Sequence, residues 1–324
     1  MRRILLIILS LLLAGLALGG VFLTQPVLFS RKARLAIPRA DLELLRSHVV
    51  KLATAFLPRS AGHPESLDAA AAYIRKELER SGGRLSEQPL TFERKTYRNV
   101  IASFGPESGE RIVIGAHYDA YGGFPGADDN ASGVAGAMEL ARMMGASPPK
   151  IRVDVVAFTL EEPPAFGSPG MGSAVHAASL RLAGDRVRAM ICLEMIGFFS
   201  DNPGSQTFPM PILRLFYPGR GNFIAVVGRP GEIGLVRAVK NAMRSASSQS
   251  VRSINGPRSL LGADLSDHAS YWDAGYPAVM ITDTAFYRNT GYHTAADLPE
   301  TLDYDRLAEV VRGVYAAILH LAES

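Results

Sequence analysis

The sequence predicts an α/β domain: a three-layer sandwich in which helices cover both faces of a mixed, mostly parallel central sheet. Two observations predict this fold class. Short apolar runs, typical of buried strands, alternate along the chain with longer segments of helical spacing. Of the 324 residues, 48% are hydrophobic, which is enough for one large core or two modest ones.

An apolar segment at the amino terminus precedes this domain. Arg2 and Arg3 come before an uncharged run, Ile4 to Thr24, which is long enough to span a bilayer. Within it, Ala14 to Gly19 resembles the end of a signal peptide. We expect residues 1–30 to be a membrane anchor or a signal peptide, and the length of the run favours a retained anchor. The orientation is weakly specified because basic residues also follow the run, namely Arg31, Lys32 and Arg34.

Residues 40–324 should form the domain itself, exported in either case: anchored to a membrane, or free in the periplasm or outside the cell. Its first part is predicted to contain two helices and a hairpin of strands at a sheet edge. Ser66 is a plausible N-cap of the second helix, and Gly82-Gly83 ends that helix. The expected helices are 41–57 and 66–81, and the alternating strands are 84–92 and 97–104.

The remainder of the domain alternates strands with helices. Residues 202–222 are rich in Pro, Gly and aromatic residues, which predicts a long ordered loop. Its aromatic residues and their neighbours could line a specificity pocket, although loop packing is the simpler interpretation; they are Phe198, Phe199, Phe208, Phe216 and Tyr217. The expected strands are 112–117, 151–160, 187–196, 223–227 and 276–282, and the expected helices are 131–144, 170–182, 232–245 and 303–321.

Polar side chains recur where successive predicted strands end. His117 and Asp119 follow the first buried strand and project to the same face. The others follow later strands or the loops after them, and they are Asp129, Glu161, Glu162, Glu194 and His293. Sites in open α/β sheets form outside the carboxyl ends of the strands, so these residues should converge. Crowded carboxylates resist joint ionisation unless a cation neutralises them. Two imidazoles and three carboxylates, without a thiolate, suit two divalent metal ions of the zinc type, and Asp129 is the candidate bridge.

These residues form a set of motifs that resembles the two-zinc exopeptidases, a superfamily that includes bacterial leucyl aminopeptidases, glutamate carboxypeptidase and the glutaminyl cyclases. The resemblance covers about Leu52 to Leu321. The motifs appear in the order of that family: His117-x-Asp119, Gly126-x-Asp-Asp-x-x-Ser-Gly133, Glu161-Glu162, the acid Glu194 and Tyr292-His293-Thr294.

The resemblance implies a role for each residue. His117 and Glu194 would hold one zinc, Glu162 and His293 the other, and Asp129 would bridge both. Glu194 departs from the pattern, since that position is often Asp, although other members carry Glu.

Three further residues receive catalytic roles from the same resemblance. Glu161 would be the general base, activating a water shared by the two ions and returning its proton to the leaving amine. Asp119 would bind His117 and fix its tautomer. Tyr292 resembles a residue that steadies the oxyanion in some members. The expected activity is that of an aminopeptidase acting on peptide substrates.

Some interpretations stay open. Asp128 could be the ligand instead of Asp129, although counting back four residues from Gly133 selects Asp129. Glu161 and Glu162 alone could be an ordinary solvated pair. His268 follows Ser266-Asp267, a segment that also occurs near the site in the family, but a direct role is not favoured. A glutaminyl cyclase-like acyl transferase with one zinc, or a non-catalytic binding domain, would be the alternative functions.

Composition and missing motifs argue against other classes. The net charge of +3 is spread along the chain without a basic block, so nucleic acid is not an expected partner. Cys192 is the only cysteine, which excludes a disulfide within the chain and a cysteine-based zinc site. Neither Gly-x-Ser-x-Gly nor His-Glu-x-x-His occurs, which argues against a serine hydrolase and a thermolysin-like site.

Overall fold

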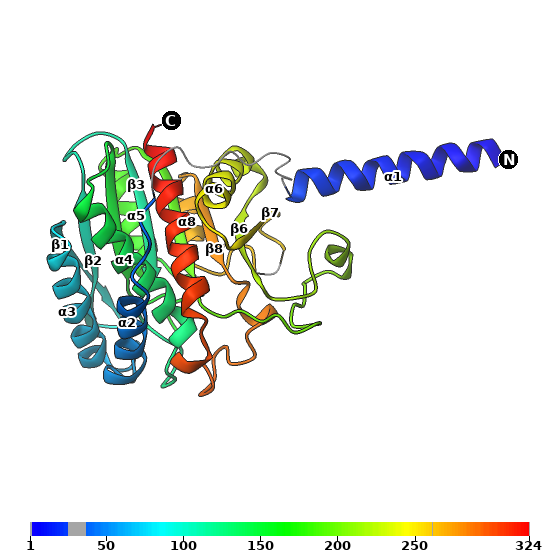
Figure 1. Cartoon of the computed structure of the whole chain (residues 1–324). Coiled ribbons are helices and arrows are strands. Elements are labelled where there is room, and N and C mark those ends of the chain that lie inside the picture. Colours follow the sequence, from blue (N-terminus) through cyan, green and yellow to red (C-terminus); the bar gives the residue numbers. More distant parts are fainter. Residues whose placement is uncertain (1, 25–36, 261, 324) are drawn as a thin grey trace.

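One mixed sheet of eight strands forms the centre of the computed structural model, which describes residues 2–24, 37–260 and 262–323 (Figure 1). The strand order is β1-β2-β4-β3-β5-β8-β6-β7. The strands are β1 (Arg84–Phe92), β2 (Lys95–Phe104), β3 (Arg111–His117), β4 (Arg152–Phe158), β5 (Val187–Glu194), β6 (Phe223–Gly228), β7 (Ser250–Asn255) and β8 (Ala278–Thr282).

The four middle strands run parallel to one another, and the strands that flank them, β2 and β6, run antiparallel to their neighbours β4 and β8. β3 pairs in parallel with β4 and β5, and β5 pairs in parallel with β8. β1 and β2 form the expected antiparallel hairpin at one edge, and β6 is antiparallel to β8. The carboxyl ends of β3, β4, β5 and β8 therefore meet at one edge of the sheet, where a site is expected.

Helices cover both faces of the sheet, so the predicted α/β class is confirmed. One apolar core joins the sheet to α2, α3, α4, α6 and α8, and a second joins its other face to α5 and α7. In β3, Ile112 and Ile114 belong to the first core and Val113 to the second, as the two-residue period of a strand requires. The helices are α2 (Leu42–Ala55), α3 (Pro64–Arg80), α4 (Gly133–Ala146), α5 (Gly172–Leu182), α6 (Ile233–Ala246), α7 (His268–Asp273) and α8 (Tyr304–Glu323).

Three details differ from the predictions. Ser66 is not an N-cap, because α3 begins at Pro64 and His63 occupies the cap position. Proline suits the first helical position since its missing N–H would have no helical partner there. Strand β7 and helix α7 were not predicted at all. The predicted loop over 202–222 contains a short 3₁₀ turn, Pro211–Leu215.

The amino-terminal helix α1 (Arg2–Thr24) projects away from the domain (Figure 1). Large apolar side chains along it are exposed, for example Leu11 (68%) and Leu12 (66%). The carbonyl oxygen of Thr24 accepts hydrogen bonds from Lys240 at 2.7 Å and Ser253 at 2.8 Å. Among the described residues, no helix has the length and apolar character needed to cross a membrane.

The membrane-anchor prediction for residues 1–30 is thus not supported, and the signal-peptide alternative stays a prediction. The basic residues that were expected to influence its orientation fall outside the described residues; they are Arg31, Lys32 and Arg34.

Candidate metal centre

The predicted site residues meet at the carboxyl edge of the parallel strands. His117 is the last residue of β3, and Glu194 is the last residue of β5. Glu161 and Glu162 follow β4, while His293 lies in the loop between β8 and α8. The sheet therefore assembles residues that are far apart in the sequence, because each parallel strand delivers its last side chains to the same edge.

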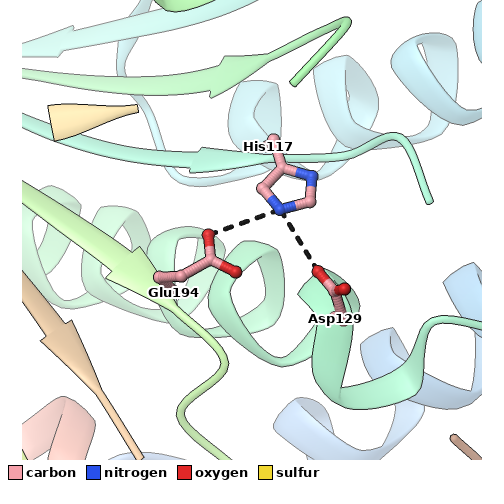
Figure 2. Close-up of side chains that lie close together, drawn as sticks. All are labelled: His117, Asp129 and Glu194. Carbon is pink, nitrogen blue, oxygen red and sulfur yellow. Dashed lines mark ion pairs between the residues drawn. The ribbon is translucent and has the colours of Figure 1, made fainter. Parts of the chain in front are cut away.

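His117, Asp129 and Glu194 form the first group that could hold a metal ion (Figure 2). The Nε2 atom of His117 lies 3.4 Å from Asp129 Oδ1 and 3.4 Å from Glu194 Oε2. One ligand atom of each residue lies within 4.8 Å of the others, and all three side chains are buried.

Asp129, Glu162 and His293 form the second group. His293 Nε2 lies 3.1 Å from Asp129 Oδ2 and 3.2 Å from Glu162 Oε1. The two carboxylate oxygens of Asp129 thus face different histidines, and Asp129 is the member that the two groups share.

The donor atoms of both groups fit divalent cations. His117 Nε2 and Glu162 Oε1 are buried without a hydrogen-bond partner, although buried polar atoms are nearly always paired. A cation would satisfy both atoms. Imidazole nitrogen and carboxylate oxygen are the ligands that zinc accepts in the absence of thiolate.

Burial and neighbouring charges shift the pKa values of the titratable side chains in the site. Burial, together with Asp129, raises the pKa of Glu162 to about 7. Burial also raises the pKa of Glu161 well above its usual value. It would lower the pKa of His293, but the adjacent carboxylates of Asp129 and Glu162 raise that pKa to about 9. In the metal-free protein the imidazole of His293 is therefore one of the cations that balance the nearby carboxylates.

Asp119 holds the two strand ends together. Its carboxylate oxygens accept hydrogen bonds from the backbone amides of Glu161 at 3.1 Å and Glu162 at 2.9 Å. The Nδ1 atom of His117 lies 3.1 Å from the backbone oxygen of Asp119 and 3.4 Å from its carboxylate. The predicted contact with His117 is present, but the backbone carbonyl is the nearer partner.

Glu161 and Tyr292 lie beside the two groups without belonging to either. Glu161 Oε2 is 3.8 Å from His117 Nε2, and its side chain is buried. The Tyr292 ring stacks on the imidazole of His293 with centroids 3.8 Å apart. Burial raises the pKa of Tyr292, so its hydroxyl stays protonated and can donate a hydrogen bond.

Asp128 and His268, the two residues considered as alternatives, have other hydrogen-bond partners. The Asp128 carboxylate accepts hydrogen bonds from the Gly197 amide at 3.0 Å and Asn289 Nδ2 at 2.9 Å, and it belongs to neither metal-binding group. His268 is buried, and its Nε2 lies 2.8 Å from the carbonyl oxygen of Ala263.

Several supporting residues were not found from the sequence. Ser266 Oγ donates to Glu194 Oε2 at 2.7 Å, and Asn130 Nδ2 donates to the same oxygen at 3.2 Å. Asp297 accepts hydrogen bonds from the backbone amides of Asp128 at 2.9 Å and Asp129 at 3.0 Å. The first two lie within recognisable motifs, whereas no motif distinguishes Asp297.

Arg59 is the least expected of these residues. The residue is buried, with 1% of its surface exposed. Its guanidinium donates to backbone carbonyl oxygens in the segments that carry His117 and Asp129. Nε donates to Tyr118 at 3.0 Å, Nη1 to Pro125 at 3.0 Å and Nη2 to Gly126 at 3.0 Å. Burial lowers its pKa to about 10, against the opposing effect of Asp119 and other nearby carboxylates.

An apolar pocket of about 110 Å³ opens beside the first metal-binding group. Glu194 and Tyr292 contribute to its wall, which connects the pocket to the site. Phe208 and Tyr217 also line it, whereas the other aromatic residues considered for this role do not; those are Phe198, Phe199 and Phe216.

Known proteins resemble this chain in sequence. The model of a family described as Peptidase family M28 matches residues 99–318. The uncharacterized protein YfbL of Escherichia coli (strain K12) is 45% identical over 306 residues, covering 91% of this chain and 94% of that protein. Leucine aminopeptidase 1 of Grosmannia clavigera is 26% identical over 238 residues, covering 69% of this chain and 53% of that protein.

Two solved structures share the fold. BSAP, a zinc aminopeptidase from Bacillus subtilis, aligns with a TM-score of 0.69 at 16% identity, covering 88% of this chain and 96% of that one. A Bacteroides thetaiotaomicron glutaminyl cyclase bound to N-acetylhistamine aligns with a TM-score of 0.67 at 20% identity, covering 88% and 99%. The predicted resemblance is confirmed by the family match, and the chain belongs to peptidase family M28.

Proposed function

We propose that this chain is a zinc-dependent aminopeptidase that removes amino-terminal residues from peptides. The observation that carries the proposal is that Asp129 belongs to both groups of candidate metal ligands. Membership of a peptidase family supports hydrolysis of a peptide bond. The likeness to leucine aminopeptidase 1 supports the aminopeptidase specificity.

Five residues would hold the two ions. His117 and Glu194 would bind one, Glu162 and His293 would bind the other, and Asp129 would bind both. Two such ions would polarise the scissile carbonyl group and lower the pKa of the attacking water.

Glu161 is suited to move the proton of that water. It lies 3.8 Å from His117 of the first group, yet neither group includes it, so its carboxylate stays free to accept a proton. In the metal-free protein burial raises the pKa of Glu161, and a carboxylate of raised pKa is a better proton acceptor. Glu161 would then donate this proton to the leaving amine, completing a cycle as base and acid.

Two residues would support this step. The protonated hydroxyl of Tyr292 would donate a hydrogen bond to the oxyanion that develops on the carbonyl oxygen. Asp119 would fix the backbone of Glu161 and Glu162 through the two amides that it accepts. The apolar pocket beside Glu194 would receive an uncharged first side chain of the substrate.

The amino-terminal sequence supports a proposal about the compartment in which the protein acts. The apolar run after Arg2 and Arg3 supports export, so we place the activity outside the cytoplasm.

The proposal is tested with matched pairs of peptides. Purified protein with zinc should release the first amino acid from a peptide beginning with Leu, and the same peptide with an acetylated amino terminus should resist cleavage. A chelator should abolish release, and zinc should restore it. Cleavage of the acetylated peptide at an equal rate would contradict an aminopeptidase.

A glutaminyl cyclase-like transferase would be the alternative. It would need one zinc, whereas the structure contains two groups that share Asp129. One zinc per chain, together with cyclisation of a peptide that begins with Gln, would favour this alternative.

A further inference from the structure

The two imidazoles of the site are oriented by different contacts. His117 has a hydrogen-bonding partner on its outer nitrogen, because its Nδ1 lies 3.1 Å from the backbone oxygen of Asp119. Metal-binding histidines usually have such a partner, which fixes the ring and its tautomer. For His293, the polar contacts found across 2–24, 37–260 and 262–323 involve only Nε2, which faces Asp129 and Glu162.

Two tyrosine rings stack on the imidazole of His293 instead. The Tyr121 ring lies 4.0 Å from the imidazole, centroid to centroid, at an angle of 3°. The Tyr292 ring lies 3.8 Å away at 16°. Because all three rings are nearly parallel, the imidazole can tilt little without meeting one of its neighbours.

Neither regular secondary structure nor the surrounding core fixes the ring of His293. The residue lies in a loop rather than a strand, with a φ of 56° in the left-handed region. Its side chain remains 23% exposed, so the surrounding core does not enclose it. Tyr292 is its neighbour in sequence, whereas Tyr121 comes from the distant loop after β3.

Tyr121 is not an ordinary core residue. It is 38% exposed, and its ring contacts are with His293 and, at 6.2 Å, with Phe124. The loop that carries it is fixed on both sides by Arg59, which donates to the carbonyl oxygens of Tyr118 and Gly126. The partly exposed ring of Tyr121 is thus placed on the imidazole of His293 by a loop that Arg59 anchors at both ends.

We propose that Tyr121 is a positioning residue for the second metal-binding group. By stacking on His293 it holds the imidazole plane so that Nε2 faces Asp129 and Glu162. For His293 the stack has the orienting role that the hydrogen bond to Nδ1 has for His117. The inference rests on the proposed function, since it assumes that His293 binds an ion.

Zinc binding to the metal-free protein, measured by competition with a chromogenic chelator, tests the proposal without substrate. Tyr121→Leu removes the ring at similar bulk, and Tyr121→Phe retains it. Phe166→Leu is the matched control, because Phe166 is an equally exposed loop aromatic, also at 38%. We expect Tyr121→Leu to weaken one of the two zinc-binding steps by about 2- to 10-fold, the range of an aromatic pair. Tyr121→Phe and Phe166→Leu should stay within about twofold of the wild type at both steps.

Three results would overturn the proposal: unchanged zinc binding in Tyr121→Leu, equal weakening of both steps, or equal losses in Tyr121→Phe and Tyr121→Leu. A general loss of fold would lower the melting temperature of the metal-free variant and affect both steps alike. The proposed peptidase activity fails separately, if a wild-type chain that binds two zinc ions releases no amino acid. A wild-type chain that binds no zinc would contradict both.

Discussion

The carboxylate of Asp119 accepts a hydrogen bond from the backbone amide of Glu162 at 2.9 Å. Its other oxygen accepts one from the adjacent amide of Glu161 at 3.1 Å. One side chain just after β3 therefore fixes the backbone of the segment after β4, where a proposed metal ligand and the proposed general base lie. Because of this contact we expect Asp119 to contribute to metal binding and to catalysis.

Replacement of Asp119 by Asn should weaken zinc binding. An amide has only one oxygen acceptor, so one of the two backbone amides would face its NH₂ group. We expect a loss of zinc affinity of about 10- to 100-fold, as for other residues that orient ligands. Chelator competition measures it, with the exposed Asp305→Asn as control. An affinity equal to that of the wild type would contradict this role.

Replacement of Glu161 by Gln should separate chemistry from binding. Gln has nearly the same shape but cannot accept the proton, so kcat should fall by at least about 10²- to 10⁴-fold. Zinc content and KM should change little, because neither metal-binding group includes Glu161. Rates of amino acid release, with metal analysis of the same sample, check this; near-normal kcat would end the proposed mechanism.

Replacement of Arg59 by Met should destabilise the metal-free protein. It would remove the guanidinium from the carbonyl oxygens of Tyr118 and Pro125, and Gly126 would lose one of its two donors. We expect a loss of about 2–4 kcal/mol in the free energy of unfolding, measured with urea in the presence of a chelator. Arg75→Met, at an exposed ion pair, should change it by less than about 1 kcal/mol. Similar losses in the two variants would show that Arg59 has no special role.

Zinc affinity should rise with pH. In the metal-free protein the pKa of His293 is raised to about 9 and that of Glu162 to about 7, so protons occupy both groups at lower pH. A metal must displace these protons, so the apparent affinity should increase from pH 6 to 9. Competition experiments, corrected for protonation of the chelator, measure the slope. A flat or falling affinity would contradict these protonation states.

Most of the fold could be predicted because its strands are short apolar runs with clear breaks. β3 is buried along its whole length and β5 at every residue except Arg188, so both stand out in the sequence. β7 does not, because only part of its length is buried and its residues are mostly polar. Helix α7 has six residues, too few for a helical period to appear. The antiparallel pairing of β6 with β8 depends on tertiary contacts that no local pattern specifies.

The convergence of the site could be predicted from the parallel strands, since their ends share one edge. Its supporting contacts could not. Arg59 acts through backbone carbonyl oxygens, and such acceptors exist at every residue, so no motif identifies it. Tyr121 stacks on His293 from a loop that is distant in the sequence, and no local pattern predicts this contact. The ligand roles themselves stay predictions, although the structure brings all five side chains together.

The most direct test of the central claim is anomalous diffraction at the zinc edge from crystals grown with zinc. We expect two peaks, one on each side of Asp129: the first beside His117 and Glu194, the second beside Glu162 and His293. The absence of any peak among these side chains would contradict the metal centre, and one peak at full occupancy would contradict the two-ion site.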